Sequence, residues 1–108
     1  MARLTSEFRV KALIRRVHDA GGSAMVLAKG DAMSGAILVL TLDRGEKPAF
    51  YERGLGGEGL IHCGPRDSGP QDVGDYWRRR RRNDPDLWVV ELSIAAAERF
   101  AAETIAVD

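Results

Sequence analysis

The stretch of residues 78–91 restricts the fold of this chain more than any other part of the sequence. Five consecutive arginines at residues 78–82 lead into Asn83-Asp84-Pro85, and an apolar run at residues 87–92 follows almost directly. The residue before a proline is pushed out of helical backbone angles, so a helix that holds the arginines must end near Asp84. Short runs rich in valine and aromatic residues are typical of strands. The stretch therefore predicts a helix, a tight turn and a strand in immediate succession.

The rest of the chain supplies the other elements of a small mixed fold. Residues 6–20 predict an amphipathic helix, capped by Thr5 or Ser6, because Val10, Leu13 and Val17 recur at helical spacing. Short strand signals follow at residues 23–28, 36–42, 49–52 and 60–63, each bounded by turn residues. A helix is expected over residues 70–82, a strand over 87–92, and a last helix after a cap at Ser93, with its tail fraying beyond Glu103.

This order of elements indicates the fold class. Consecutive strands joined by short links pair antiparallel as a rule, so we expect an α+β fold. The prediction is a single domain over residues 1–108, with a mostly antiparallel sheet of four to five strands and two to three packed helices, in the order α-β-β-β-β-α-β-α.

Composition excludes several classes of function. Sixteen Lys and Arg balance sixteen Asp and Glu, so no overall field draws the chain to nucleic acid or to an anionic membrane. Cys63 is the only cysteine, which excludes an intrachain disulfide and a zinc site built from several thiolates of one chain. Residues 1–7 show no signal peptide, and the longest apolar run, residues 36–40, is too short to span a bilayer. By elimination, we expect a cytoplasmic protein.

The arginine run supports two interpretations. On a helix, Arg80 and Arg81 continue the apolar side, while Arg78, Arg79 and Arg82 point outward. Residues 67–86 hold as many carboxylates as arginines, five of each. The carboxylates are Asp67, Asp72, Asp75, Asp84 and Asp86. Because Asp75 precedes Arg78 and Arg79 by three and four residues, helical ion pairs are favoured and the helix is expected to be solvated and charge-paired.

Polyanion binding is the alternative interpretation of this helix. Arg78, Arg79 and Arg82 could make bidentate contacts to phosphates, and Tyr76 or Trp77 could stack on a base of RNA. If the two long helices lie side by side, further cations would join this surface, and these are Lys11, Arg15 and Arg16.

No complete catalytic, cofactor or metal site is evident. The pattern Gly54-x-Gly56-x-x-Gly59 resembles a dinucleotide-binding loop, but the following residues, 60–65, cannot begin the helix that such a loop requires. His62 and Cys63 are neighbours on a predicted strand and therefore face opposite sides. A small hydrolase using Cys63 with His62 or His18, or a metal-dependent enzyme, stays a remote alternative. The carboxylates that would serve such an enzyme are Asp84, Asp86 and Glu91.

Several segments together resemble a family of short bacterial proteins of unknown function. They are residues 4–8, 12–17, 29–31 with 35–39, and above all the block Asp-Pro-Asp-Leu-Trp-Val-Val-Glu at residues 84–91. The resemblance covers residues 4 to about 92 and leaves the alanine-rich tail outside it. It implies a small bacterial protein and brings no catalytic residues, cofactors or ligands with it.

Association with another protein, or with a second copy, is the function that the sequence favours. Phe8 lies on the cationic side of the first helix, where something must cover it, such as the C-terminal helix or a second subunit. Tyr76 and Trp77 add aromatic surface beside arginines, and these residue types are enriched at the centres of interfaces. We therefore expect a non-catalytic protein with Phe8, Tyr76 and Trp77 as candidate interface residues.

Overall fold

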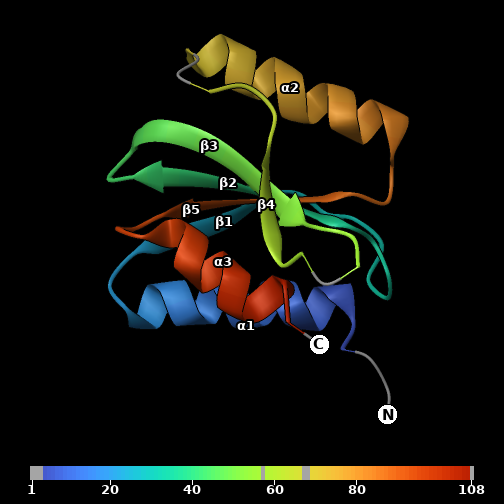
Figure 1. Ribbon diagram of the computed structural model, residues 1–108, viewed down its shortest axis with the longest axis horizontal. Helices are drawn as coiled ribbons and strands as arrows, with labels where there is room; N and C mark the ends of the chain where they lie inside the picture. Colours follow the sequence, from blue (N-terminus) through green and yellow to red (C-terminus); the bar gives the residue numbers. More distant parts are fainter. Residues whose placement is uncertain (1–3, 57, 67–68, 108) are drawn as a thin grey trace.

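The computed structural model describes residues 4–56, 58–66 and 69–107, and Figure 1 shows its elements. Their bounds are α1 (Ser6–Asp19), β1 (Ser23–Ala28), β2 (Ile37–Asp43), β3 (Glu46–Arg53), β4 (Leu60–Cys63), α2 (Pro70–Asn83), β5 (Trp88–Ser93) and α3 (Ala97–Ile105). The order matches the prediction. Thr5 caps α1, since its hydroxyl oxygen accepts a hydrogen bond from the backbone N–H of Phe8 at 3.1 Å. Asp84 follows the last residue of α2, directly before Pro85.

The five strands form one sheet in the order β1-β5-β2-β3-β4. In the described part of the chain, β2 and β5 pair in parallel and the other three pairs are antiparallel, which confirms the mostly antiparallel α+β fold. The expectation that consecutive strands pair is wrong for β1 and β2, because β5 lies between them. Residues 37–40 and 88–90 are buried and apolar without alternation, as in strands covered on both faces, so β2 and β5 take central places and β1 is left at the edge.

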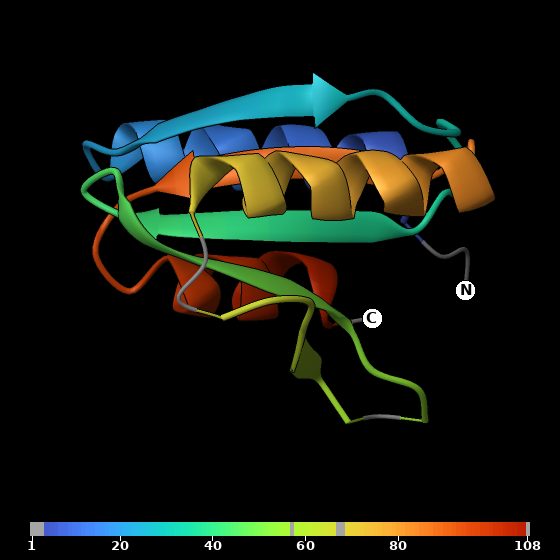
Figure 2. The same cartoon turned by 90° about the horizontal axis from the view of Figure 1, so that it is seen from above.

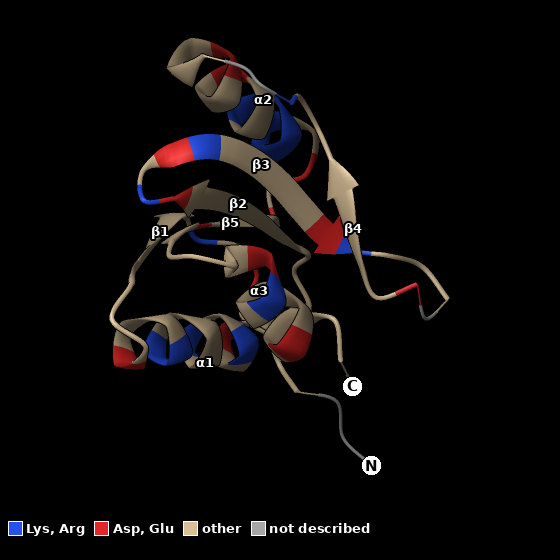
Figure 3. Ribbon diagram, turned by 60° about the vertical axis from the view of Figure 1, so that its left-hand side comes forward, with Lys and Arg blue, Asp and Glu red and all other residues tan. Residues whose placement is uncertain are grey.

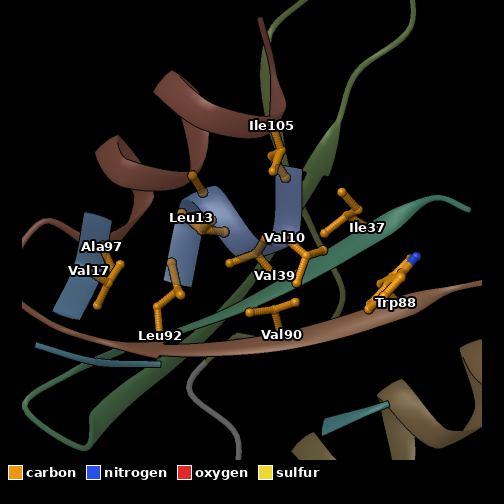
Figure 4. Packing of buried hydrophobic residues seen from close by; sticks show 11 residues of the cluster. Val10, Leu13, Val17, Ile37, Val39, Trp88, Val90, Leu92, Ala97 and Ile105 are labelled. Carbon is orange, nitrogen blue, oxygen red and sulfur yellow. The ribbon is translucent and has the colours of Figure 1, made fainter. Parts of the chain in front are cut away.

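The helices cover both faces of the sheet. Figure 1 shows α1 and α3 together on one face and α2 alone on the other, and Figure 2 shows α2 lying over the sheet, along the direction of β2. The larger core lies between the sheet and the helix pair α1 and α3, where Val10 and Leu13 of α1 meet Val39 and Val90 of the sheet (Figure 4). Beneath α2 lies a smaller core of Leu38, Leu40, Phe50, Leu87 and Val89.

The last helix differs from the prediction at both ends. It begins at Ala97 after Ala96, which has a left-handed backbone with φ of 56°, and no side chain caps it. Ser93 is not the cap; its hydroxyl oxygen instead accepts a hydrogen bond from the N–H of Gly45 at 3.1 Å. The helix also continues to Ile105, whose side chain is buried against α1, so packing holds a turn that we expected to fray. No helix in the described ranges combines the length and hydropathy of a membrane span.

Candidate functional site

Arg80 turns inward and fastens α2 to the sheet. Its two terminal nitrogens reach the carboxylate oxygens of Glu52 on β3 at 2.8 and 3.3 Å, and one of them also donates to the Tyr76 hydroxyl at 2.9 Å. Both members of the ion pair are only 28% exposed. Burial by itself raises the pKa of Glu52, but the hydrogen bond and charge of Arg80 outweigh it and leave the pKa below its ordinary value. The pair is a structural anchor.

Arg81 also serves the fold. Its guanidinium donates to the backbone carbonyl of Leu87 at 3.0 Å and to that of Pro85, on the turn that leads into β5. Carbonyls at a helix end and in the turn after it need donors, and a cation near a helix C-terminus is stabilised by the helix dipole. Arg81 therefore joins the end of α2 to the start of β5.

The other three arginines form the outer arginine set: Arg78, Arg79 and Arg82. All three are exposed, and they give α2 its cationic second half, as Figure 3 shows. The guanidinium of Arg78 lies 4.9 Å from the centre of the Trp77 ring, and that of Arg79 lies 5.7 Å from the Tyr76 ring.

The outer arginine set lacks the ion pairs that its sequence predicts. Within the described ranges, no carboxylate lies at ion-pair distance from any of its three members, so the expected pairing of Asp75 with Arg78 and Arg79 is not formed. Asp84 is used locally instead, since its carboxylate accepts a hydrogen bond from the backbone N–H of Asp86 at 3.1 Å. Asp67 lies outside the described residues.

The cations of α1 do not join this surface. Lys11 pairs with Glu7 at 3.3 Å and Arg15 approaches Asp19 at 3.8 Å. Arg16 pairs with Glu103 of α3 at 2.7 Å. Since α1 and α2 cover opposite faces of the sheet (Figure 1), the condition for a combined polyanion surface is not met.

The three candidate interface residues do not form one surface, because Phe8 lies on α1 and the other two lie on α2, on the opposite face of the sheet. Phe8 is 57% exposed, because α3 contacts a different side of α1, so the C-terminal helix does not cover it. Tyr76 and Trp77 are half-buried and pack on the smaller core, with the Tyr76 ring centre 4.7 Å from that of Phe50. Both border the outer arginine set, since Trp77 lies beside Arg78 and Tyr76 beside Arg79.

The residues considered for catalysis do not converge. Cys63 packs beneath α2, and burial raises the pKa of its thiol, which disfavours the thiolate that a nucleophile needs. On the opposite face of β4, the His62 ring stands edge-on to Tyr51 at 5.6 Å, and burial together with the charge of Arg66 lowers the pKa of His62. His18 lies at the far end of α1. No three His, Cys, Asp or Glu side chains in the described ranges are grouped to hold a metal ion. The glycine loop leads into β4 and not into a helix.

The most specific sequence block forms a packed junction with the loop between β1 and β2. The Trp88 indole N–H donates to the carbonyl of Asp31 at 2.7 Å, and the backbone N–H of Asp31 donates to the carbonyl of Asp86 at 3.0 Å. Gly30 and Gly35 lie against the same carbonyl: a Cβ built on them would be 2.1 and 2.2 Å from the Asp86 oxygen. We call the contact between residues 30–35 and residues 84–88 the loop junction.

Comparison with known proteins places the chain in a family. Residues 4–102 match the family described as protein of unknown function, DUF1491. The chain belongs to the DUF1491 family. This confirms the resemblance read from the sequence, and the match also takes in most of the alanine-rich tail, which we had placed outside it. No curated protein matches the chain.

Solved structures of similar proteins share this DUF1491 fold. The crystal structure of a DUF1491 family protein from Caulobacter crescentus CB15 is 34% identical, with a TM-score of 0.77 over 91% of this chain and 94% of that one. An NMR structure of a DUF1491 family protein from the same organism has a TM-score of 0.74 at 34% identity, over 93% and 94%. A solution structure of a protein from A. tumefaciens has a TM-score of 0.70 at 33% identity, over 85% and 86%.

The residues that carry the DUF1491 resemblance are structural in this chain. Asp31, Gly35, Asp86 and Trp88 meet one another in the loop junction, where backbone N–H and C=O groups and the Trp88 indole N–H are hydrogen-bonded to one another. A signal for this role was present in the sequence, since Gly30 and Gly35 flank a turn where the backbone of another segment must approach closely. The outer arginine set is left as the candidate functional site of this DUF1491 protein.

Proposed function

We propose that this protein is a non-catalytic binding protein, and that it associates with an acidic protein partner through the exposed side of α2. The observation that carries the proposal is the division of the arginine run. Arg80 and Arg81 are engaged by the fold, whereas the outer arginine set is exposed and has no carboxylate partner within the described ranges. We also propose a cytoplasmic location, which the presence of a single cysteine, and so of no intrachain disulfide, supports.

The chemistry of the outer arginine set fits carboxylates of a partner. A guanidinium binds a carboxylate through two parallel hydrogen bonds, which gives geometric selectivity as well as attraction. Arg78 lies over the half-buried Trp77 ring, and a guanidinium held on an aromatic face loses less freedom when it binds. Arginine and tryptophan together are also the residue types that most often dominate interface energies.

The charges beside the outer arginine set favour a protein over a nucleic acid. Asp72 and Asp75 are exposed on the same helix, and with Arg79 they line a shallow hollow next to Gly64. Phosphates that follow a nucleic-acid backbone would meet these two carboxylates as well as the arginines. A protein surface can place acidic side chains opposite the arginines and basic or neutral ones opposite Asp72 and Asp75.

A binding titration tests this proposal. The probe is a short, fluorescently labelled, glutamate-rich peptide at low salt, with a single-stranded RNA oligonucleotide titrated in parallel. We expect the peptide to bind and the triple substitution Arg78→Ser, Arg79→Ser, Arg82→Ser to weaken its binding at least about tenfold. Added salt should weaken binding too, because exposed charge pairs are screened.

The matched control removes three exposed cations from the opposite side of the sheet: Lys11→Ser, Arg15→Ser and Arg99→Ser. It changes the net charge by the same amount, so an effect of overall charge would appear in both triple variants. No peptide binding by the wild type, or equal weakening by the two variants, would refute the proposal. RNA binding that depends on the outer arginine set, without peptide binding, would replace the acidic protein with a polyanion as the ligand.

A further inference from the structure

Strand β1 presents an unpaired edge, which is a second surface independent of α2. In the sheet order, β1 is an outer strand, and among the described residues it pairs only with β5. Figure 2 shows it along one margin of the molecule, with its outer side open. The backbone N–H and C=O groups of an outer strand that point away from the sheet are a template on which another strand can pair.

The two edges of the sheet differ in how well they are protected. The opposite edge, β4, has four residues and is flanked by Gly59 and Gly64, both with positive φ, which ends any regular pairing quickly. Strand β1 has six residues, Ser23–Ala28, with no charge, proline or glycine among them. Natural proteins commonly use such residues to block edge pairing, so residues 23–26 of β1 lack this protection.

Exposed apolar side chains of β1 lie on both faces of the sheet. Met25 is 53% exposed and lies opposite Glu91 of β5. Val26 is 37% exposed and lies opposite Val90, which belongs to the core beneath α1. A bulge between Val26 and Ala28 ends the regular register, so the part of β1 suited to pairing is residues 23–26.

We propose that a second copy of this chain pairs with β1 in antiparallel orientation, which joins the two sheets into one across a two-fold axis. Opposed residues of an antiparallel pair must project on the same face, so the axis passes through a residue and not between two. An axis at Met25 sets the two Met25 side chains against each other and each Val26 against Ala24 of the partner copy. In this register the partner strand covers Met25 and Val26, the two exposed apolar residues of β1. Because β1 has no charged residue, the pairing brings no like charges of the two strands together.

Self-pairing also explains why a second copy suits this edge better than an unrelated strand. In a two-fold dimer both copies contribute the same surface patch, so the patch must be complementary to itself. Strand β1 meets this condition because it has no charge that would repel its own copy and no proline that would block pairing. The register centred on Ala24 would set Val26 opposite Gly22, outside the strand, and the one centred on Val26 would set Met25 opposite Leu27, at the bulge. The Met25-centred register pairs residues 24–26 with one another, so both exposed apolar residues are paired within the regular part of β1.

A charge-swap experiment tests this dimer. The wild type at high micromolar concentration should sediment with the mass of two chains. Met25→Lys and Met25→Glu each place two like charges at the axis and should weaken the dimer at least about tenfold, giving monomers at the same concentration. Mixed together, the two variants should recover the dimer mass, because a lysine then faces a glutamate across the axis. Damage to the fold alone would not be repaired by mixing.

Met33→Lys is the matched control, since Met33 is 69% exposed but lies beyond β1 on the following loop. It should leave the dimer intact. A monomeric wild type, variants that remain dimeric, or a mixture that stays monomeric would each overturn the proposal. The experiment does not involve the outer arginine set, so its outcome is independent of the peptide titration.

Discussion

Replacing Gly35 by alanine is expected to destabilise the protein by about 3 kcal/mol or more, because the new methyl group would overfill a site enclosed by backbone. A Cβ at this position would lie 2.2 Å from the carbonyl oxygen of Asp86 and 2.9 Å from the backbone nitrogen of Asp31. Neither atom belongs to a side chain that can rotate away. The loop junction would have to open, and the Trp88 bond to Asp31 would be lost with it. Urea unfolding, monitored by tryptophan fluorescence, measures the decrease in the free energy of unfolding.

Gly69→Ala is the control for this substitution. Gly69 has open space where its Cβ would lie and precedes α2 without a side-chain cap, so its replacement should change the free energy of unfolding by less than about 1 kcal/mol. If Gly35→Ala were as mild as Gly69→Ala, the loop junction could not be the rigid contact that the structure describes.

Local signals in the sequence were sufficient to predict the elements and the two sides of α2. Helical spacing placed Arg80 and Arg81 on the inner side and the outer arginine set on the exposed side, and the structure agrees. Pro85 fixed the end of α2 because its effect on the preceding residue is local. Such patterns depend on residues within one or two turns of each other, which a single sequence displays directly.

Contacts between distant segments could not be predicted in the same way. Strand β5 lies between β1 and β2 because β2 and β5 are apolar on both faces and so take the central places in the sheet. Finding this order requires a comparison of all the strands, whereas local pairing rules consider only neighbours along the chain. The bond between Arg80 and Glu52 joins residues 28 apart along the chain, and no spacing rule connects a helix residue to a strand residue. Asp75 was expected to pair with Arg78 and Arg79, but ion pairs on a solvated helix face are weak and the side chains are free to adopt other positions.

Replacing Arg80 by methionine should cost about 2–3 kcal/mol of stability at neutral pH, since it leaves a half-buried carboxylate and hydroxyl without their donor. Glu52 and Tyr76 are the groups concerned. The cost should also depend on pH. Because the folded protein holds the pKa of Glu52 below its unfolded value, the stabilisation is present above the unfolded pKa and is lost as the pH falls through the folded one.

Urea unfolding of wild type and Arg80→Met at neutral and at acid pH measures both effects. The difference in free energy of unfolding between wild type and Arg80→Met should become smaller at acid pH, because protonation of Glu52 removes the charge that Arg80 neutralises. Arg82→Met, which removes an exposed arginine from the same helix, should change stability by no more than about 0.5 kcal/mol. An equal cost for the two substitutions, or a cost at Arg80 that does not vary with pH, would contradict the role of Arg80 as an anchor.

A series of single substitutions separates the structural arginines of residues 78–82 from those that we propose bind a partner. Each of the five arginines is replaced by glutamine, and each variant is measured for urea stability and for affinity to the glutamate-rich peptide. The variants at Arg78, Arg79 and Arg82 should bind the peptide more weakly and keep their stability. The variants at Arg80 and Arg81 should be less stable, but their folded state should bind the peptide with unchanged affinity. If all five variants lost peptide affinity equally, or if the loss occurred mainly in the Arg80 and Arg81 variants, the division of the arginine run into structural and binding residues would be contradicted.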